Sequence, residues 1–161
     1  MGDPAGIGPE IIIKFMEKYI SEQNKSVKIV ISGSRKILEE TAAAMGKKIE
    51  TVLFESFEKT EAGKVYIIDS KIDSSRILRG VPDKLSGQLS IDYLNNGLEL
   101  VTGGIADAIV TAPISKDAIN LAGYNYSGHT EYLAEKTHTE DFGMVLKGNK
   151  ISVILNSTHV S

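Results

Sequence analysis

The sequence contains no cysteine and no tryptophan, and only four of its 161 residues are proline. Without cysteine the chain can form neither a disulfide framework nor a thiolate metal site, so any transition-metal ligand must be histidine or a carboxylate. A chain without disulfides fits an intracellular compartment. We therefore expect a cytoplasmic protein.

Long apolar runs and an excess of one charge are also absent. The longest apolar runs, such as residues 11–13 and 108–110, are far too short to span a bilayer, and the N-terminus does not resemble a signal peptide. The formal net charge is −3, with Lys and Glu interleaved. This gives no long-range field for nucleic acid or anionic lipid, so we expect a soluble, unprocessed protein with neither partner.

What remains is an ordinary globular composition with 42% hydrophobic side chains, enough for one core. Apolar spacing predicts helices that alternate with strands, which favours a layered α/β fold. The predicted helices follow Pro9 and cover about 35–45, 86–101, 116–121 and 130–137. The strands are 27–32, 51–54, 64–68, 108–111, 144–146 and 151–155, with Gly148-Asn149 as a hairpin turn and 70–83 irregular.

Both ends of the sequence look cut. An anion-binding glycine loop needs a strand before it, yet Met1 lies directly on such a loop. The chain stops two residues after His159, which follows a predicted strand in the position where α/β folds place functional side chains. We expect a fragment of a longer chain, with an uncertain internal boundary.

The first candidate segment is the loop Gly2–Glu10, which reads GDPAGIGPE. Gly6 and Gly8 permit close backbone approach, and the helix that follows offers unpaired N–H groups to an anion. The same glycines would also suit a purely structural connection between strand and helix. The loop is not a nucleotide P-loop, and its spacing departs from the dinucleotide fingerprint.

The second candidate segment, Thr111–Lys116, follows a predicted buried strand. Lys116 could meet a phosphate or carboxylate as a point charge, while Ser115 is suited to cap the next helix. A solvated Lys116 is the alternative.

The third candidate segment, Gly128–Glu131, places His129 and Thr130 at a predicted helix start. Imidazole, hydroxyl and helix dipole could together hold a phosphate, or Thr130 could simply cap the helix. His138, at a polar helix end, reads as structural. His159 alone is no metal site, because a site needs three or four ligands.

Three motifs in this order resemble the 4-hydroxythreonine-4-phosphate dehydrogenase family of pyridoxal phosphate biosynthesis. They are GDPAGIGPE, TAPISKDAINLAGYNYSGHTEYLAEKT and STHV, and they span nearly the whole chain. The resemblance implies a layered α/β/α fold like that of isocitrate and isopropylmalate dehydrogenases, with two domains and a homodimer whose active site the partner subunit completes. This chain would be the N-terminal half.

The resemblance also implies roles for particular residues. His129 and Thr130 match the family's substrate-binding pair, and His159 matches the first of three histidines that bind a divalent metal. Lys116 and the loop with Asp3, Gly6 and Gly8 have supporting places at the cleft. No catalytic residue is assigned in this fragment.

The implied reaction is NAD-linked oxidation, with decarboxylation, of 4-hydroxy-L-threonine 4-phosphate (4-phosphooxy-threonine). A divalent metal (Zn, Mg, Mn or Co) would lower the pKa of the substrate hydroxyl and stabilise the charge that develops on decarboxylation, with NAD or NADP accepting the hydride. The family's other two metal histidines and most of its NAD site lie beyond the end of this chain. We therefore expect the 161 residues alone to be inactive.

Two alternatives remain open. A related dehydrogenase for 4-phospho-threonate or 4-phospho-erythronate would use the same contacts. A truncated, non-catalytic domain that binds phosphorylated ligands or dimerises is the alternative from another class.

Overall fold

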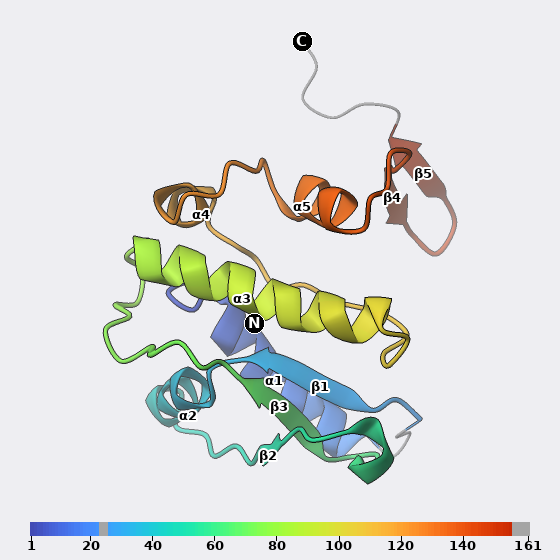
Figure 1. Ribbon diagram of the computed structural model, residues 1–161. Coiled ribbons are helices and arrows are strands. Elements are labelled where there is room, and N and C mark those ends of the chain that lie inside the picture. Colours follow the sequence, from blue (N-terminus) through green and yellow to red (C-terminus); the bar gives the residue numbers. More distant parts are fainter. Residues whose placement is uncertain (23–25, 156–161) are drawn as a thin grey trace. The chain divides into compact units, whose positions relative to one another are not determined.

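The computed structural model describes residues 1–22 and 26–155, and the chain divides into two compact units between Asn125 and Tyr126 (Figure 1). The first unit contains α1 (Gly8–Ser21), β1 (Ile29–Gly33), α2 (Arg35–Ala44), β2 (Val52–Leu53), the 3-10 helix η1 (Phe57–Lys59), β3 (Val65–Asp69), α3 (Lys84–Thr102) and α4 (Lys116–Leu121). The second unit contains α5 (His129–Lys136), β4 (Met144–Lys147) and β5 (Ser152–Leu155). The alternation expected from the sequence is therefore present.

A parallel sheet forms the centre of the first unit, in the order β1-β3-β2. Ile31 pairs with Ile67 across β1 and β3, and Leu53 of β2 pairs with Ile67 from the other side. β3 is therefore the inner strand of the three. Its residues Val65, Tyr66 and Ile67 are all buried, as expected for a strand covered on both faces.

Helices α1 and α2 cover one face of this sheet with an apolar core. Met16 of α1 and Leu38 of α2 are fully buried and belong to one cluster with Ile31 and Ile67. Burying side chains of this size stabilises a fold by about 1.5–3 kcal/mol each. Because α1 packs on the sheet, the direction from which the preceding loop enters α1 is fixed.

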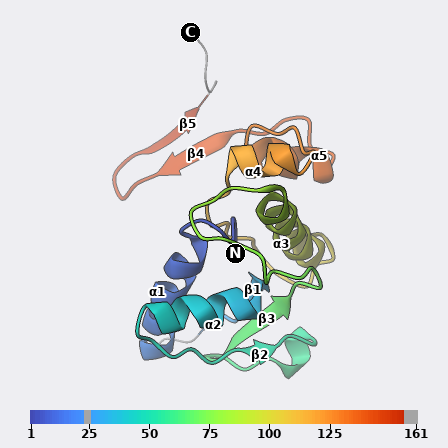
Figure 2. The same ribbon diagram turned by 90° about the vertical axis from the view of Figure 1, so that its left-hand side faces the viewer.

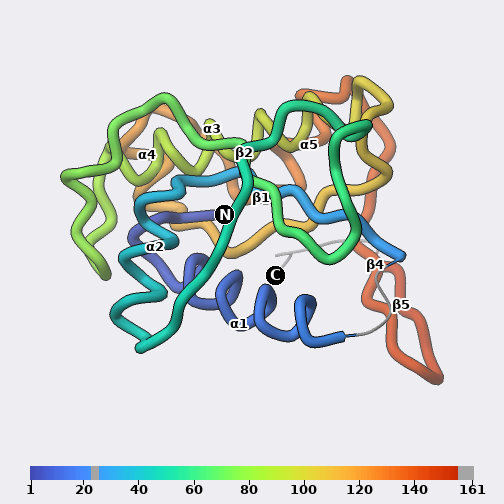
Figure 3. Tube along the Cα trace, turned by 90° about the horizontal axis from the view of Figure 1, so that it is seen from below, coloured from blue at the N-terminus to red at the C-terminus, as the bar shows by residue number. Residues whose placement is uncertain are grey.

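Helix α3 covers the other side of β1. Figures 2 and 3 both place β1 between α1 and α3, which gives the layered α/β/α arrangement expected from the sequence. Helix α4 packs on α3 at Gly87, where an added Cβ would lie 1.9 Å from the backbone oxygen of Ala118. Only a glycine allows the two backbones to come this close.

Local capping explains where the helices begin. Ser34 caps α2 by accepting the Ile37 N–H at 3.3 Å, and Ser115 caps α4 by accepting the Ala118 N–H at 3.2 Å. Asp83 caps α3 in a reciprocal capping box with Ser86. Helix α3 thus starts two residues before the start predicted from the sequence.

The polar stretch 70–83 contains neither helix nor strand, as predicted. It is held by contacts with distant elements. The Gly80 N–H donates to the Ala5 oxygen at 2.7 Å, and the Arg79 guanidinium donates to the Thr41 hydroxyl at 2.7 Å. Ser74 and Ser34 also share a buried hydrogen bond of 2.8 Å.

The strand predicted over 108–111 is wrong. These residues lie in no ladder with any strand of the described part of the chain, and Val110 is 95% exposed. A strand interior needs neighbours for its N–H and C=O groups, whatever its own β propensity. Ile109 instead lies against Gly97 of α3.

In the second unit β4 and β5 form the predicted antiparallel hairpin, with Val145 opposite Ile154. The turn closes through the Gly148 N–H, which donates to the Ile151 oxygen at 2.9 Å. The hairpin is short and its apolar side chains are largely exposed.

Among the described helices, none combines the length and apolar character required to cross a membrane.

The close approach at Gly87 predicts a stability effect. Gly87→Ala should lower the free energy of unfolding by about 1–2 kcal/mol, because the new methyl group meets the α4 backbone and overpacking outweighs the helix-propensity gain of alanine. Urea titration followed by circular dichroism measures the change.

Gly97→Ala is the matched control in the same helix. There the new Cβ would meet only the end of the flexible Ile109 side chain, so the change should stay within about 1 kcal/mol. Equal effects of the two substitutions would contradict the packing assigned to Gly87.

Candidate functional site

The glycine-rich loop before α1 lies between the carboxyl end of β1 and residues 112–113. The Met1 amino group donates to the Ser32 oxygen at 2.7 Å, and the Asp3 N–H donates to the Pro113 oxygen at 2.8 Å. Gly2 has a positive φ of 73°, and a Cβ there would lie 2.3 Å from the Pro113 oxygen. The loop therefore has one place in the fold, and no side chain fits at Gly2.

Gly6 and Gly8, both expected at the cleft, differ in what surrounds them. A Cβ on Gly8 would lie 2.2 Å from the Met1 oxygen, so this position requires glycine. Gly6 is exposed, and a Cβ there would only touch Asp3 at 3.5 Å. The close backbone approach expected of both glycines is present at Gly8, where the partner is the chain itself.

Asp3 is buried, with 5% of its surface exposed, and it organises the loop from within. Its Oδ1 accepts the Ala5 N–H at 2.9 Å, and its backbone oxygen accepts the Gly6 N–H at 3.1 Å. Burial raises the pKa of the Asp3 carboxyl, and the nearby Asp83 raises it further, although hydrogen bonds from Ala5 and Ser86 act in the opposite direction. Two loop N–H groups are thus used inside the protein.

Lys116 is the first residue of α4, directly after the capping Ser115. Its side chain is exposed, and no ion pair within residues 1–22 and 26–155 involves it. The Lys116 ammonium is therefore open to solvent, which fits both an anion contact and the solvated lysine that is its alternative.

His129 and Thr130 open α5 in the second unit. The structure corrects one detail here, because Gly128 is the residue that caps α5 and Thr130 already lies inside the helix. Gly128 enters the helix with extended backbone angles and no side-chain cap, which places the cap two residues earlier than the expected Thr130. Both side chains thus belong to the first helical turn, whose N–H groups carry the positive end of the helix dipole.

Aromatic contacts hold the first turns of α5. Tyr132 is 2% exposed and packs edge-to-face on Tyr126, with ring centroids 4.9 Å apart, and the Lys136 ammonium lies 5.5 Å from the Tyr132 ring. Burial lowers the pKa of the half-buried His129, which favours the neutral imidazole near pH 7. A neutral imidazole can donate one hydrogen bond and accept another.

The structure tests the predicted role of His138 but not that of His159. His138 follows α5 with a positive φ of 53°, and its N–H donates to the Glu135 oxygen at 3.1 Å, so it terminates the helix. His159, predicted as a metal ligand, lies outside the described residues. Within the described part of the chain no three His, Asp or Glu side chains form a group that could hold a metal ion.

The sequence reasoning missed a set of polar groups beyond the carboxyl ends of β1 and β3. The Ser70 hydroxyl donates to Asp92 at 2.6 Å, while the hydroxyls of Ser32 and Tyr93 are buried with no hydrogen-bond partner among residues 1–22 and 26–155. Burial, and then Asp92, Asp69 and Asp3, raise the pKa of the Tyr93 phenol. Periodicity placed Tyr93 on the buried side of α3, but its polar surroundings come from segments far away in the sequence.

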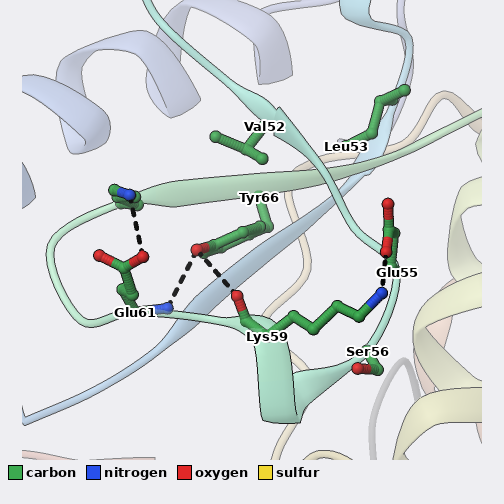
Figure 4. Close-up of a pocket in the computed structure, with 8 residues that line it drawn as sticks. Val52, Leu53, Glu55, Ser56, Lys59, Glu61 and Tyr66 are labelled. Carbon is green, nitrogen blue, oxygen red and sulfur yellow. Dashed lines mark hydrogen bonds and ion pairs between the residues drawn. The ribbon is translucent and has the colours of Figure 1, made fainter.

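A separate hollow of about 220 Å³ lies over β2, η1 and β3 (Figure 4). Its two lysines are already paired, Lys59 with Glu55 and Lys64 with Glu61, and the Tyr66 hydroxyl accepts the Glu61 N–H at 3.0 Å. These charges are mutually satisfied, and the hollow contains none of the residues expected to bind substrate. We therefore do not assign the site to it.

Known proteins match the chain over almost its full length. A family model described as "Pyridoxal phosphate biosynthetic protein PdxA" matches residues 24–161. The D-threonate 4-phosphate dehydrogenase of Salmonella typhimurium is 36% identical over 162 residues, covering 100% of this chain and 50% of that protein. The 4-hydroxythreonine-4-phosphate dehydrogenase of a Sulfurihydrogenibium species is 34% identical, covering 99% of this chain and 48% of its own length.

Solved structures agree with these matches. The crystal structure of 4-hydroxythreonine-4-phosphate dehydrogenase from Klebsiella pneumoniae superimposes with a TM-score of 0.88 at 33% identity, covering 100% of this chain and 49% of that one. The chain thus spans about half the length of the relatives that it matches. By the family model, the relatives and the shared fold, this chain belongs to the PdxA family of pyridoxal phosphate biosynthetic proteins.

Proposed function

We propose that this chain is the substrate-binding portion of a dehydrogenase that oxidises, with decarboxylation, 4-hydroxy-L-threonine 4-phosphate in pyridoxal phosphate biosynthesis. The observation that carries the proposal is the family match over residues 24–161, together with relatives named as dehydrogenases of phosphorylated hydroxy acids. We further propose that the protein acts as a homodimer in the cytoplasm.

His129 and Thr130 are proposed to bind the phosphorylated substrate. Both lie in the first turn of α5, where unpaired N–H groups and the helix dipole favour an anion. The neutral His129 ring can donate to a phosphate oxygen, and the Thr130 hydroxyl can do the same. The packed Tyr126–Tyr132 pair fixes the turn before the ligand arrives, so that less ordering is required on binding.

Lys116 is proposed to contact a phosphate or carboxylate through its ammonium group. It is exposed and has no ion pair within the part of the chain that the structure describes. A point charge of this kind attracts an anion without demanding one orientation.

NAD or NADP as hydride acceptor and a divalent metal (Zn, Mg, Mn or Co) belong to the proposed activity of the whole protein. The described residues fit neither group. Residues 1–22 and 26–155 contain no three-ligand cluster for a metal, and the Ala5 and Gly6 N–H groups of the glycine loop are occupied by Asp3. We therefore assign the described residues to substrate binding and derive no step through the metal or the dinucleotide.

D-Threonate 4-phosphate is the second candidate substrate. It is favoured by relatives that carry this name, including the 36%-identical Salmonella protein. The two substrates share the phosphate and the oxidised hydroxyl but differ at the second carbon, where one carries an amino group and the other a hydroxyl group. None of the contacts assigned above reaches that difference.

The role of α5 predicts a loss of binding on substitution. His129→Ala should weaken the binding of 4-hydroxy-L-threonine 4-phosphate by about tenfold, because one hydrogen bond to a charged group is lost. Isothermal titration of the purified chain measures the dissociation constant. Thr130→Val, which keeps the shape but removes the hydroxyl, should have an effect of similar size.

His138→Asn is the matched control, because asparagine tolerates the positive φ at this helix end and the position carries no proposed ligand contact. It should bind like the unchanged chain. Equal affinity of the His129→Ala and His138→Asn variants would count against the substrate site at α5.

Because the described residues fit neither a metal nor a dinucleotide, we expect the chain by itself to lack dehydrogenase activity. The 161-residue chain should bind the phosphorylated ligand but produce no NADH when supplied with NAD and Mg²⁺, Mn²⁺, Zn²⁺ or Co²⁺, as followed by absorbance. Binding without turnover is also the result expected of a non-catalytic domain. Turnover by this chain would refute the prediction, and the ratio of kcat/KM for the two substrates would then identify the preferred one.

A further inference from the structure

Asp3 closes the glycine loop on itself through a turn of the Asx type. Its Oδ1 accepts the Ala5 N–H at 2.9 Å, while its backbone oxygen accepts the Gly6 N–H at 3.1 Å. Because the side chain is buried, water cannot replace this acceptor when it is removed. One carboxylate oxygen of Asp3 is therefore the side-chain contact that holds the turn inside the loop.

The same residue fixes a segment far away in the sequence. The Asp3 N–H donates to the Pro113 oxygen at 2.8 Å, and the adjacent Gly2 lies so close to that oxygen that a Cβ would sit 2.3 Å from it. The position of Pro113 thus follows from the backbone position of residues 2–3.

Pro113 leads directly into α4. Ser115 caps this helix and Lys116 is its first residue, while Gly87 of α3 receives the Ala118 backbone without intervening side-chain atoms. The short segment that carries Lys116 is therefore held on one side by the glycine loop and on the other by α3. A displacement of the loop would therefore also displace Lys116.

We propose that Asp3 is a positioning residue for Lys116, because its carboxylate oxygen fixes the glycine loop and the loop backbone fixes the start of α4. This inference rests on the proposed function, in which Lys116 contacts the phosphate or carboxylate of the substrate. Asp3 itself has no ligand contact in this scheme.

The role requires a hydrogen-bond acceptor and not a negative charge. Burial raises the pKa of Asp3, and Asp83 close by also disfavours its ionised form. An asparagine in its place retains an oxygen that can accept the Ala5 N–H. Asp3→Asn should therefore preserve the loop, whereas a general base or a metal ligand would be inactivated by the same substitution.

Amide hydrogen exchange, read by two-dimensional NMR on the 161-residue chain, tests the positioning directly. In Asp3→Ala the exchange of the residue 3 amide, the donor to Pro113, should accelerate by about tenfold, and the Lys116 amide signal should shift. In Asp3→Asn both should remain as in the unchanged chain. Asp3→Ser, whose hydroxyl is a weaker acceptor, gives a second reading should Asp3→Ala fail to fold.

Asp73→Ala is the matched control. Asp73 makes the same kind of turn, accepting the Ser75 N–H at 2.9 Å, but it lies exposed on the surface. Its removal should change neither the residue 3 amide nor the Lys116 signal. Unchanged exchange in Asp3→Ala, or equal damage in Asp3→Asn and Asp3→Ala, would overturn the proposal.

Titration with inorganic phosphate, followed on the backbone amide signal of residue 116, separates this inference from the proposed function. Phosphate affinity should fall by about tenfold in Asp3→Ala, remain unchanged in Asp3→Asn and be lost in Lys116→Met. If the unchanged chain shows no phosphate response at Lys116 while the exchange pattern is as expected, the ligand contact of Lys116 is refuted. The fixing of Pro113 by Asp3 is then still supported. Equal phosphate affinity in all variants would also refute the ligand contact of Lys116, and together with unchanged exchange in Asp3→Ala it would overturn both.

Discussion

The loop before α1 passes through a space that admits no Cβ at Gly2 or Gly8, and this steric constraint determines the relative positions of its neighbours. Met1 is bonded to the end of β1, and Asp3 is bonded to Pro113 just before α4. The parallel sheet, helix α1 and the segment with Lys116 therefore meet at this loop. The position of the loop determines the positions of the segments bonded to it, because each contact is made by backbone atoms, which have few alternative conformations.

The placement of polar groups follows from this arrangement. The glycine loop lies at the carboxyl end of β1, where Ser32 belongs to the strand and neighbouring segments supply Asp3, Asp92 and Tyr93. Ligands in open α/β sheets bind outside the carboxyl ends of the strands. The first unit thus has the organisation of an open α/β domain, while α5 carries His129 and Thr130 in a unit whose turns are fixed by its own aromatic contacts.

Local chemistry explains which features could be predicted from the sequence. The caps at Ser34 and Ser115 and the Gly148-Asn149 hairpin depend on a few neighbouring residues, and the structure contains all three. The strand over 108–111 was wrong because a strand exists only where partners offer hydrogen bonds, and no local pattern contains that information. The start of α5 shifted because the extended backbone of Gly128 enters the helix before Thr130.

The same division holds for the residues proposed to bind substrate. Motif order pointed to His129, Thr130 and Lys116, but the burial of Asp3 and its bond to Pro113 depend on segments that meet only in the folded chain. A crystal structure of the chain with 4-hydroxy-L-threonine 4-phosphate tests the substrate site most directly. We expect the phosphate group within hydrogen-bonding distance of the His129 imidazole and the Thr130 hydroxyl. A phosphate bound elsewhere, with both side chains free of it, would contradict the account.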